Sequence, residues 1–454
     1  MMNKKGSSII SILAMLALAL LAAPVSASAS HSSFARTYTG PSSFEATSIQ
    51  EQHDGGFIVA GFAGGVRFLK QTWLLRLDNS GLILWQKAYG SVDVTADGSI
   101  AGFRGPTVRN SPDGGFVIAS STMASSHVAA WIFKVDASGS LVWQEVFTGD
   151  GAASARSIDV ASNGGYVAVA ATISTNVTFP ETRTLVTRFD ENGSLLWQFV
   201  YDGSGVTAAP DSIAHADDGG FVVVGQTFPA DPWMLRLDSA GGVVWERLWE
   251  AGVGSELTSV QQTSDMGFVA VGALWSYGPS SASKNVLVVK LDSEGSVTWM
   301  KSYGLGGLWA SASSIQQTSN GNFIVVGGVG SFRPFLASAV IIRLDSSGNI
   351  LWEKSFDTSS QFAIGASSMV QTPNGKFVVS GTIFAQTAQA WILKLNGNGR
   401  AGGCDSVTDE SLVAANPNLR IIAFSGKAIN VTSEPVPTFY LPESTSPVAS
   451  TVCQ

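Results

Sequence analysis

One pattern of residues recurs seven times along this 454-residue chain, and the recurrence constrains the fold more than any other feature of the sequence. The full pattern has a small residue followed by an apolar one, a polar stretch, Asp-Gly or Asn-Gly, an aromatic residue with a β-branched run, a variable loop, an apolar segment, Asp-x-x-Gly and Trp. The copies begin at Ser48, Thr107, Ser157, Ser212, Ser259, Ser314 and Ser368. Repetition at this period, 47 to 59 residues from start to start, is typical of propellers and solenoids.

Each copy reads as four β-strands. In the sixth copy, Asn320-Gly321 separates two strand-like segments, 314–318 and 323–327, because glycine tolerates the positive φ of a tight hairpin. An apolar segment, such as 73–77 in the first copy, then leads into the Asp-x-x-Gly turn. The fourth segment carries a tryptophan seven residues after that aspartate: Trp85, Trp143, Trp197, Trp245, Trp299 and Trp352. Four antiparallel strands are the unit of a β-propeller blade, so the sequence predicts an all-β fold.

The two ends of the repeat region indicate a closed ring. Gly403 stands where the seventh copy should have its tryptophan, so that copy lacks a fourth strand. A segment before the first copy, 31–40, matches the missing strand, with Phe34 in the position of Trp85. A first strand that completes the last blade removes an open sheet edge. The sequence therefore predicts a seven-bladed β-propeller over 31–403, closed by a clasp strand at 31–40.

These repeats resemble those of a known group. The string Ser-Ile-Gln-Gln-Thr-Ser-Asn-Gly…Phe-Ile-Val-Val-Gly…Leu-Asp-Ser-Ser-Gly-Asn-Ile-Leu-Trp, between Ser314 and Trp352, is similar to the repeats of secreted bacterial and archaeal β-propeller proteins of the SBBP-like type. Its Leu-Asp-x-x-Gly-x-x-x-Trp half also resembles the tryptophan-docking element of quinoprotein propellers. The resemblance covers about residues 31–403 and implies the architecture. It implies no cofactor, because no residues of a cofactor pocket match, and no particular activity, because one fold hosts many functions.

The N-terminus has the pattern of a secretory signal peptide over residues 1–29. Lys4 and Lys5 precede an apolar stretch at 9–23, and small residues follow at 25–29. The apolar stretch has about 15 residues, whereas a membrane span needs roughly 20, which disfavours a membrane anchor. We therefore expect a secreted protein, extracellular or periplasmic, without a transmembrane segment.

The last segment, 404–454, breaks the repeat and is rich in proline, serine and threonine. Its Cys404 and Cys453 are the two cysteines of the chain, and two thiols in an exported chain most simply form one disulfide. Such a bond closes a loop of about 50 residues and stabilises the fold by roughly 4 kcal/mol on the chain-entropy model. Free or metal-bound thiols are the alternative, but they lack supporting His or Cys neighbours. We expect a tail tethered to the ring, although its composition also suits attachment to a surface or a neighbouring molecule.

Two side chains recur in the repeats without indicating a site. Rows of tryptophan bind sugars in some proteins, yet a tryptophan placed in the same strand of each copy favours packing between blades. A basic residue stands two positions before each Asp/Asn of the second turn: Arg76, Lys134, Arg188, Arg236, Lys290, Arg343 and Lys394. We expect these cations to pair with nearby aspartates or backbone groups, at about 0–1 kcal/mol each if exposed. The turn aspartates lack the ligand pattern of a calcium loop.

The sequence contains no catalytic motif and no recognisable metal site. The four histidines lack metal-ligand spacing, and a net charge of −8 without a basic run argues against nucleic-acid binding. The first strand of each blade lines the axis, where Glu51, Arg109, Asp159 and His215 interrupt a series of glutamines. These four are weak catalytic candidates for a small polar site in the channel. The alternative is an ordinary solvated channel lining.

Variation in length is concentrated on one face of the predicted ring. The loops between second and third strands, and between blades, share this face, and binding residues concentrate on such loops. Its aromatic and arginine side chains are our candidates for ligand binding: Trp275, Tyr277, Trp309, Arg333 and Phe335. Mixed aromatics and arginine suit contact with a protein or a glycan. The alternative is that these loops only pack on one another.

We therefore expect a secreted, non-enzymatic β-propeller scaffold that binds a protein or cell-envelope glycan through the variable loop face. Two other functions stay open. One is an extracellular polysaccharide hydrolase or lyase that uses Glu51, Asp159 and His215 in the channel. The other is a structural subunit of an extracellular matrix or filament.

Overall fold

The computed structural model describes residues 33–401, except Pro41 and the segments 65–68, 94–103, 125–126, 149–150, 175–180, 203–206, 228–230, 252–253, 278–281, 305–307, 332–335 and 357–361. Beyond residue 401 it describes the backbone of five short strands. The predicted signal peptide, Cys404 and Cys453 lie outside the described residues.

All regular structure in the described residues is β-strand, arranged as four antiparallel strands per repeat. The prediction of an all-β, propeller-like fold is confirmed in these terms. Repeat 1 contains β2 (Ser43–Glu51), β3 (Phe57–Gly64), β4 (Leu69–Leu77) and β5 (Ile83–Asp93). Repeat 2 contains β6 (Thr107–Asn110), β7 (Phe116–Ala124), β8 (His127–Val135) and β9 (Leu141–Phe147). Repeat 3 contains β10 (Ala153–Val160), β11 (Tyr166–Ser174), β12 (Glu181–Phe189) and β13 (Leu195–Asp202). Repeat 4 contains β14 (Ala208–His215), β15 (Phe221–Thr227), β16 (Pro232–Leu237) and β17 (Val243–Glu250).

The remaining repeats follow the same order. Repeat 5 contains β18 (Glu256–Gln262), β19 (Phe268–Tyr277), β20 (Ala282–Leu291) and β21 (Val297–Gly304). Repeat 6 contains β22 (Trp309–Gln317), β23 (Phe323–Ser331), β24 (Leu336–Leu344) and β25 (Ile350–Phe356). Repeat 7 contains β26 (Ala363–Gln371), β27 (Phe377–Phe384) and β28 (Gln389–Leu395), and β1 (Phe34–Thr39) lies beside β28. Repeats 5 and 6 are also joined by one parallel bridge, between Lys284 and Trp309.

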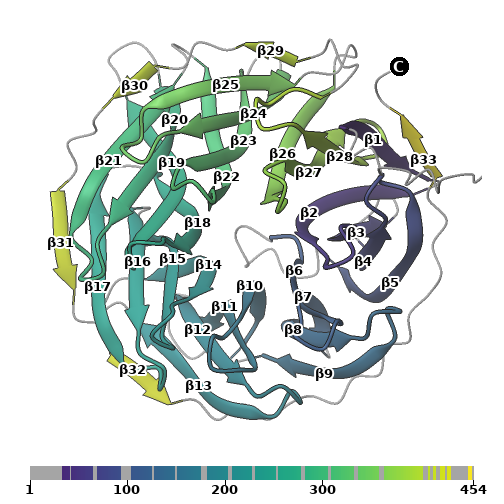
Figure 1. Cartoon of the computed structure of the whole chain (residues 1–454). Helices are drawn as coiled ribbons and strands as arrows, with labels where there is room; N and C mark the ends of the chain where they lie inside the picture. The colour runs from purple at the N-terminus through teal and green to yellow at the C-terminus, as the bar shows by residue number, and fades with distance from the viewer. Residues whose placement is uncertain are drawn as a thin grey trace, which may run out of the picture. The chain divides into compact units, whose positions relative to one another are not determined.

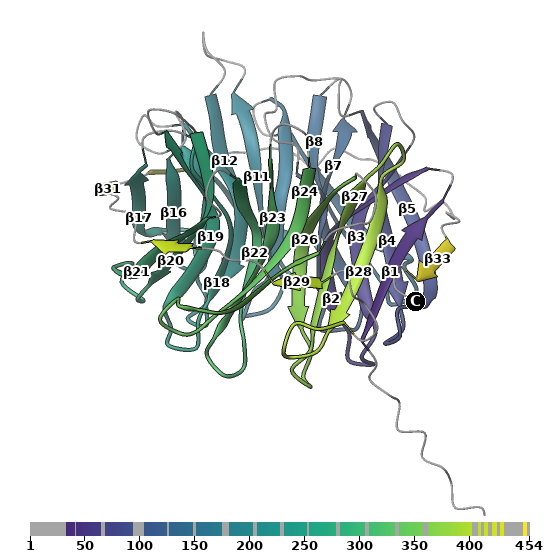
Figure 2. The ribbon, with the colours of Figure 1, turned by 90° about the horizontal axis from the view of Figure 1, so that it is seen from above.

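The sheets stand around a central axis, with the first strand of each repeat innermost and the fourth outermost (Figure 1). Seen at 90° to that view, the strands run roughly along the axis (Figure 2). Apolar side chains of adjacent sheets meet between them. One such cluster joins Ile58 and Leu74 of repeat 1 to Val108 and Phe133 of repeat 2. Burial between neighbouring sheets is therefore what holds consecutive repeats together.

The first hairpin of each repeat turns at the predicted Asp/Asn-Gly position. The second turn residue has a positive φ, such as 81° at Gly321. Repeat 5 has Met266 at this place, with φ 65°, the one non-glycine residue with positive φ in the described part of the chain. A side chain in this left-handed region is unfavourable. The hairpin forms nevertheless, with Met266 N–H donating to Thr263 O at 2.9 Å.

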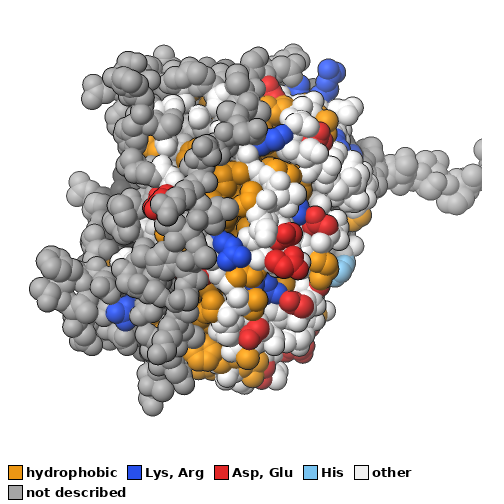
Figure 3. Space-filling model, turned by 90° about the vertical axis from the view of Figure 1, so that its left-hand side faces the viewer, with side chains coloured by type: hydrophobic (Ala, Val, Ile, Leu, Met, Phe, Trp, Pro, Cys, Tyr) orange, Lys and Arg blue, Asp and Glu red, His pale blue; other side chains and the backbone are white. Residues whose placement is uncertain are grey.

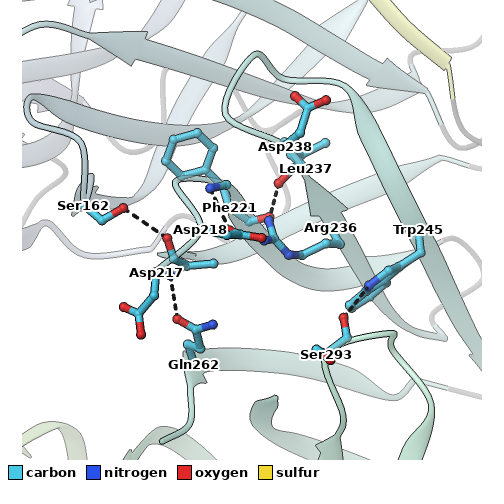
Figure 4. A network of polar contacts seen from close by, with 12 residues as sticks. Ser162, Asp217, Asp218, Phe221, Arg236, Leu237, Asp238, Trp245, Gln262 and Ser293 are labelled. Atoms are coloured by element: carbon cyan, nitrogen blue, oxygen red, sulfur yellow. Dashed lines mark hydrogen bonds and ion pairs between the residues drawn. The ribbon is translucent and has the colours of Figure 1, made fainter. Parts of the chain in front are cut away.

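An aromatic residue of each fourth strand packs against a turn glycine of the next repeat. Figure 4 shows one of these residues, Trp245, with its hydrogen bond to Ser293. Trp245 lies against Gly295, where an added Cβ would stand 2.8 Å from the indole, and its Nε1 donates to Ser293 O at 3.3 Å. Trp85, Trp197 and Trp299 make the same kind of bond, at 3.1 to 3.2 Å. The predicted packing role of these tryptophans is confirmed.

The seven repeated cations are more buried than the sequence analysis allowed. Their partners are the first-turn Asp or Asn in five repeats, as in Arg236–Asp218 at 2.6 Å, and backbone carbonyls in the other two (Figure 4). Arg236 is 5% exposed and also donates to Phe221 O at 3.0 Å. The pairing was predicted, but the expectation of 0–1 kcal/mol was for exposed cations and does not apply, because a buried cation that loses its partner is strongly destabilising.

The contacts of β1 reach the first repeat as well as the last. β1 pairs antiparallel with β28, from Phe34 opposite Lys394 to Tyr38 opposite Ala390. Phe34 lies against Gly81 of repeat 1, and Tyr38 Oη donates to Gly81 O at 2.8 Å.

The described strands after residue 401 extend the outer edges of the sheets (Figure 1). Four of them pair antiparallel with the fourth strands of repeats 6, 5, 4 and 3 in turn, and the last pairs antiparallel with β1. β29 (Val407–Asp409) pairs with β25, β30 (Val413–Ala415) with β21, β31 (Arg420–Phe424) with β17, β32 (Lys427–Asn430) with β13, and β33 (Val448–Thr451) with β1. We call these five strands the outer belt.

Candidate functional site

The innermost strands are joined side by side by short polar side chains. Ser259 Oγ accepts the N–H of Ile315, and the side-chain oxygen of Gln261 accepts the N–H of Gln317 at 2.8 Å. Gln316 does the same for Gln371, again at 2.8 Å. Each of these side chains is held in place because its oxygen accepts a backbone N–H of the next inner strand.

Repeats 2 to 4 replace this amide pattern by three charged or titratable groups. Asp159 of β10 accepts the N–H of His215 at 2.9 Å, as a glutamine does elsewhere, and also contacts His215 Nδ1 at 2.8 Å. Its other oxygen accepts a bond from Arg109 Nε at 3.0 Å. The structure therefore brings together three of the four channel candidates.

The electrostatics of this cluster favour the charged forms. Burial alone raises the pKa of Asp159, but the hydrogen bond from His215 and the charge of Arg109 outweigh burial and hold it below its usual range. The hydrogen bond to Asp159 raises the pKa of His215 above its ordinary value, against the effect of burial. Asp159 is thus a satisfied carboxylate with both oxygens engaged.

The fourth candidate, Glu51, lies apart from this cluster. No hydrogen bond or ion pair joins its carboxylate to Arg109, Asp159 or His215 in the described residues. Burial raises its pKa to about 7, and the charge of Lys394 opposes that shift. Glu51 also does not line the central cavity, whereas the other three do.

The central cavity has a volume of about 560 Å³ and is bounded by the inner strands. Ion pairs connect inner strands at the end nearer the variable loops. Arg104 binds Asp211 at 2.9 Å and Glu256 at 3.1 Å, linking the segment before β6 to β14 and β18 across the ring. The carboxylate of Asp211 raises the pKa of Arg104 further above its ordinary value. β-Bulges help to position these groups, because the pairing of β14 with β15 shifts register at Asp211.

A second group of side chains stands beside the variable loops of repeats 5 and 6. Trp275, Lys284 and Trp309 occupy adjacent strands, paired across β19–β20 and β20–β22. The two indoles meet edge to face at 4.8 Å, and Lys284 Nζ lies 5.3 Å from the Trp275 ring. Lys284 also contacts Glu256 at 3.4 Å. Both tryptophans are partly buried.

The other variable-face candidates cannot be placed at this group. Tyr277 ends β19, and its side chain lies outside the described residues, as do Arg333 and Phe335 entirely. Sequence reasoning did not find Lys284 or Glu256, which join the group through contacts across strands. Their spacing of 28 residues forms no local motif, so only the repeat register aligns them.

Within the described residues, no three His, Cys, Asp or Glu residues are grouped to hold a metal ion. The same part of the chain contains no helix long and apolar enough to cross a membrane.

The chain matches no protein-family model and no curated protein. Solved structures similar to it include Sqt1 from Chaetomium thermophilum, with 13% identity, a TM-score of 0.45, and coverage of 80% of this chain and 98% of that one. The polysaccharide lyase Uly1 has 10% identity, a TM-score of 0.49, and coverage of 77% and 90%. A protein of unknown function from Dyadobacter fermentans has 12% identity, a TM-score of 0.44, and coverage of 80% and 98%. Similarity at this level carries no information about ligand or activity.

Proposed function

We propose that this chain is an exported seven-bladed propeller that acts as a binding scaffold for a protein or cell-envelope glycan. The observation that carries the proposal is the group of Trp275, Lys284 and Trp309 beside the variable loops of repeats 5 and 6. Partly exposed indoles with an adjacent cation and carboxylate supply the aromatic anchor and hydrogen-bonding groups that binding surfaces use.

The residues of the channel support a binding scaffold better than they support a hydrolase or lyase. An acid–base pair needs a carboxyl group free to exchange a proton with the substrate. Asp159 has both oxygens occupied by Arg109 and His215 and a lowered pKa. Glu51, whose pKa of about 7 would suit a general acid, makes no contact with that cluster in the described residues.

Ring closure by β1 is part of the proposal. The support is that Phe34 and Tyr38 of β1 contact the Gly81 turn of repeat 1. Aromatic residues of a regular fourth strand contact the following repeat in the same way. Further bonds join the same repeats at the inner and intermediate strands. Ser368 Oγ accepts the N–H of Ile49, and Phe44 N–H donates to Ala388 O at 2.8 Å.

We also propose that Cys404 and Cys453 form a disulfide that seals the outer belt. Support comes from the ends of the belt, because β33 and β28 flank the same strand, with Thr451 opposite Arg36 and Lys394 opposite Phe34. Cys453 follows Thr451 by two residues, and Cys404 follows Lys394 by ten. The mass of peptides from the exported protein, with and without reduction, tests the bond, and a free thiol at either position would refute it.

The scaffold proposal is tested with the double variant Trp275→Ser/Trp309→Ser. Binding to glycans on an array, or to proteins pulled down from the native secretome, should be lost. The free energy of unfolding should change by no more than about 1 kcal/mol, as is usual for surface positions. A loss of several kcal/mol would mean that the two indoles are a packing cluster, and retained binding would remove this surface from the proposal.

A further inference from the structure

Part of the lining of the central cavity consists of hydrogen-bond donors, and the repeat itself places them there. A glutamine whose side-chain oxygen accepts a backbone N–H must direct its amide nitrogen elsewhere, because the two atoms share one planar group. Four cavity-lining glutamines are held in this way. Gln261 accepts the N–H of Gln317, Gln316 that of Gln371, Gln262 that of Asp217, and Gln317 that of Ser264. Their oxygens are used at 2.7 to 2.8 Å, so the amide nitrogens remain as donors toward other groups. One of them, Gln317 Nε2, makes a long bond of 3.4 Å to Gly321 O.

The charged groups of the cavity add to this bias. Arg109 and His215 share one carboxylate, that of Asp159, and both its oxygens are occupied. A guanidinium has five donor hydrogens. Arg109 donates from Nε to Asp159 and from Nη1 to Val108 O, and its Nη2 makes no bond within the described residues. The His215 side chain is 41% exposed, lines the cavity and uses Nδ1 for Asp159, which leaves Nε2 without a bond within the described residues. With Arg109 and His215 both charged, these two side chains and Asp159 together carry one net positive charge, and the carboxylate of Asp217, which also lines the cavity, offsets it.

The cavity also has the size of a small-molecule site. Its volume of about 560 Å³ lies within the range of roughly 300–1,000 Å³ typical of ligand pockets. The Arg104 ion pairs cross the ring on the loop side, at Asp211 and Glu256, which come before the cavity-lining serines of β14 and β18. At the side of the first hairpin turns, Ser264 and Ser319 line the cavity.

We propose that this cavity binds a small ligand that carries a carboxylate and several further acceptor oxygens, as a uronic acid does. The carboxylate pairs with Arg109 and His215, and the hydroxyl oxygens accept from the glutamine amides. A charged acceptor next to guanidinium and imidazolium groups forms the stronger class of hydrogen bond. A ligand made of donors or apolar groups would leave the amide nitrogens and Arg109 unsatisfied. This site is separate from the variable loop face and independent of its proposed role.

The repeat supplies matched variants for the test. Arg109→Gln places at the third inner position the residue found there in three repeats, at Gln50, Gln261 and Gln316. His215→Gln does the same at the fourth position, where Gln262, Gln317 and Gln371 stand. Both variants should fold, since they restore the repeat pattern. Lys301→Gln, on β21 with its Nζ bonded to exposed Asn349, removes one positive charge outside the cavity and is the control.

The experiment is calorimetric titration of the full exported chain with glucuronate, and with glucose as the neutral sugar of the same size. We expect glucuronate to bind, glucose to bind at least tenfold more weakly, and Arg109→Gln and His215→Gln each to weaken glucuronate at least tenfold. Lys301→Gln and Trp275→Ser/Trp309→Ser should bind glucuronate as the unchanged chain does, which separates this site from the loop face. No binding of glucuronate at 10 mM (roughly the weak limit of specific recognition) would overturn the proposal. Equal binding by glucose or by Arg109→Gln would also overturn it.

Discussion

The junction between repeats 7 and 1 differs from the junction between repeats 1 and 2 in the group that donates to the turn carbonyl, and it shares this difference with the junction between repeats 6 and 7, where Arg343 donates to Gly397 O. Between repeats 1 and 2, Trp85 donates to Ala137 O at 3.1 Å and Tyr89 donates to Gly139 O at 2.7 Å. Between repeats 7 and 1, β1 retains the tyrosine bond through Tyr38 but has Phe34 in the place of the tryptophan. The aromatic ring and the tyrosine are thus common to these two junctions, whereas the fourth strands of repeats 2, 4 and 6 have Phe147, Trp249 and Phe356 in the place of the tyrosine.

The missing indole bond at the junction of repeats 7 and 1 is replaced by a group from another strand. Asn79 O, the equivalent of Ala137 O, accepts a bond from Lys394 Nζ at 3.0 Å. The two residues are 315 positions apart in the chain. The comparison teaches that docking requires an aromatic face against a turn glycine, whereas the donor for the turn carbonyl need not come from the same strand.

The largest expected effect comes from removing β1. Deletion of residues 33–40 leaves β28 with an open edge and removes fully buried Tyr38 from the core. We expect aggregation, or a fall in Tm of roughly 10 °C or more. The comparison is made by thermal unfolding of the chain with and without the segment. A monomeric truncated chain with the same Tm would mean that the junction does not depend on β1.

A smaller effect is expected from truncating one docking residue at each kind of junction. Trp245→Ala should lower the free energy of unfolding by about 3–5 kcal/mol, since the indole is 8% exposed and hydrogen-bonded. Phe34→Ala should lower it by about 2 kcal/mol, because that ring is more exposed and forms no hydrogen bond to the turn. Urea unfolding of both variants gives the ranking. Equal losses would show that the indole bond and deeper burial contribute nothing.

Much of this architecture was predictable because it is periodic. The spacing of Trp245 from its turn aspartate indicated both strand and packing, and the match of Phe34 to that series indicated the partner of β28. The positions of the repeated cations were predicted from the sequence, but their burial was not. Burial depends on the aromatic rings of the next repeat, such as that of Phe268, which lies 5.5 Å from the guanidinium of Arg236.

The candidate sites were less predictable because their contacts cross between repeats. The contact of Asp159 with Arg109 and His215 follows from inner-strand register across three repeats. The bonds of Arg104 cross the ring and leave no sequence pattern. The sequence also contains a second regular series of tryptophans, from which no prediction was made. Fully or nearly fully buried tryptophans stand three residues before the repeated cation in four repeats: Trp73, Trp131, Trp233 and Trp391.

The stability contributed by the contact between the inner strands of repeats 3 and 4 should depend on pH. The corresponding contacts made by glutamine side chains in other repeats should not. Asp159, with a lowered pKa, stabilises the fold above the ordinary aspartate pKa, and this contribution is lost as pH falls through its folded value. His215, with a raised pKa, stabilises the fold below the ordinary histidine pKa, and this is lost as pH rises through its folded value. The pair therefore contributes most between about pH 4 and 6.5.

Asp159→Gln tests this difference, since it installs the residue of repeats 5 and 6. At pH 5.5 the variant should be less stable than the unchanged chain by about 1–2 kcal/mol, a figure reduced by the exposure of the histidine ring. At pH 8.5 the gap should narrow. Urea unfolding at both pH values measures it, and a gap that is constant or widens with pH would contradict the assigned pKa directions.

The smallest effect concerns a hydrogen bond that β1 lacks. In repeats 1, 2 and 4 the residue after the docking tryptophan accepts a bond from the third-strand indole, as Gln86 does from Trp73 at 3.3 Å. In β1 this position is Ala35, and the buried Nε1 of Trp391 has no partner among the described residues.

Ala35→Gln should supply that acceptor and raise the free energy of unfolding by about 1 kcal/mol, the usual gain from satisfying a buried donor. Ala35→Met fills a similar volume without an acceptor and separates the hydrogen bond from added apolar contact. A gain with glutamine and none with methionine would show that the junction of repeats 7 and 1 is limited by this bond. If both variants lose stability, the space beside Trp391 is too small for the side chain, and the junction has compensated for its alanine by closer packing.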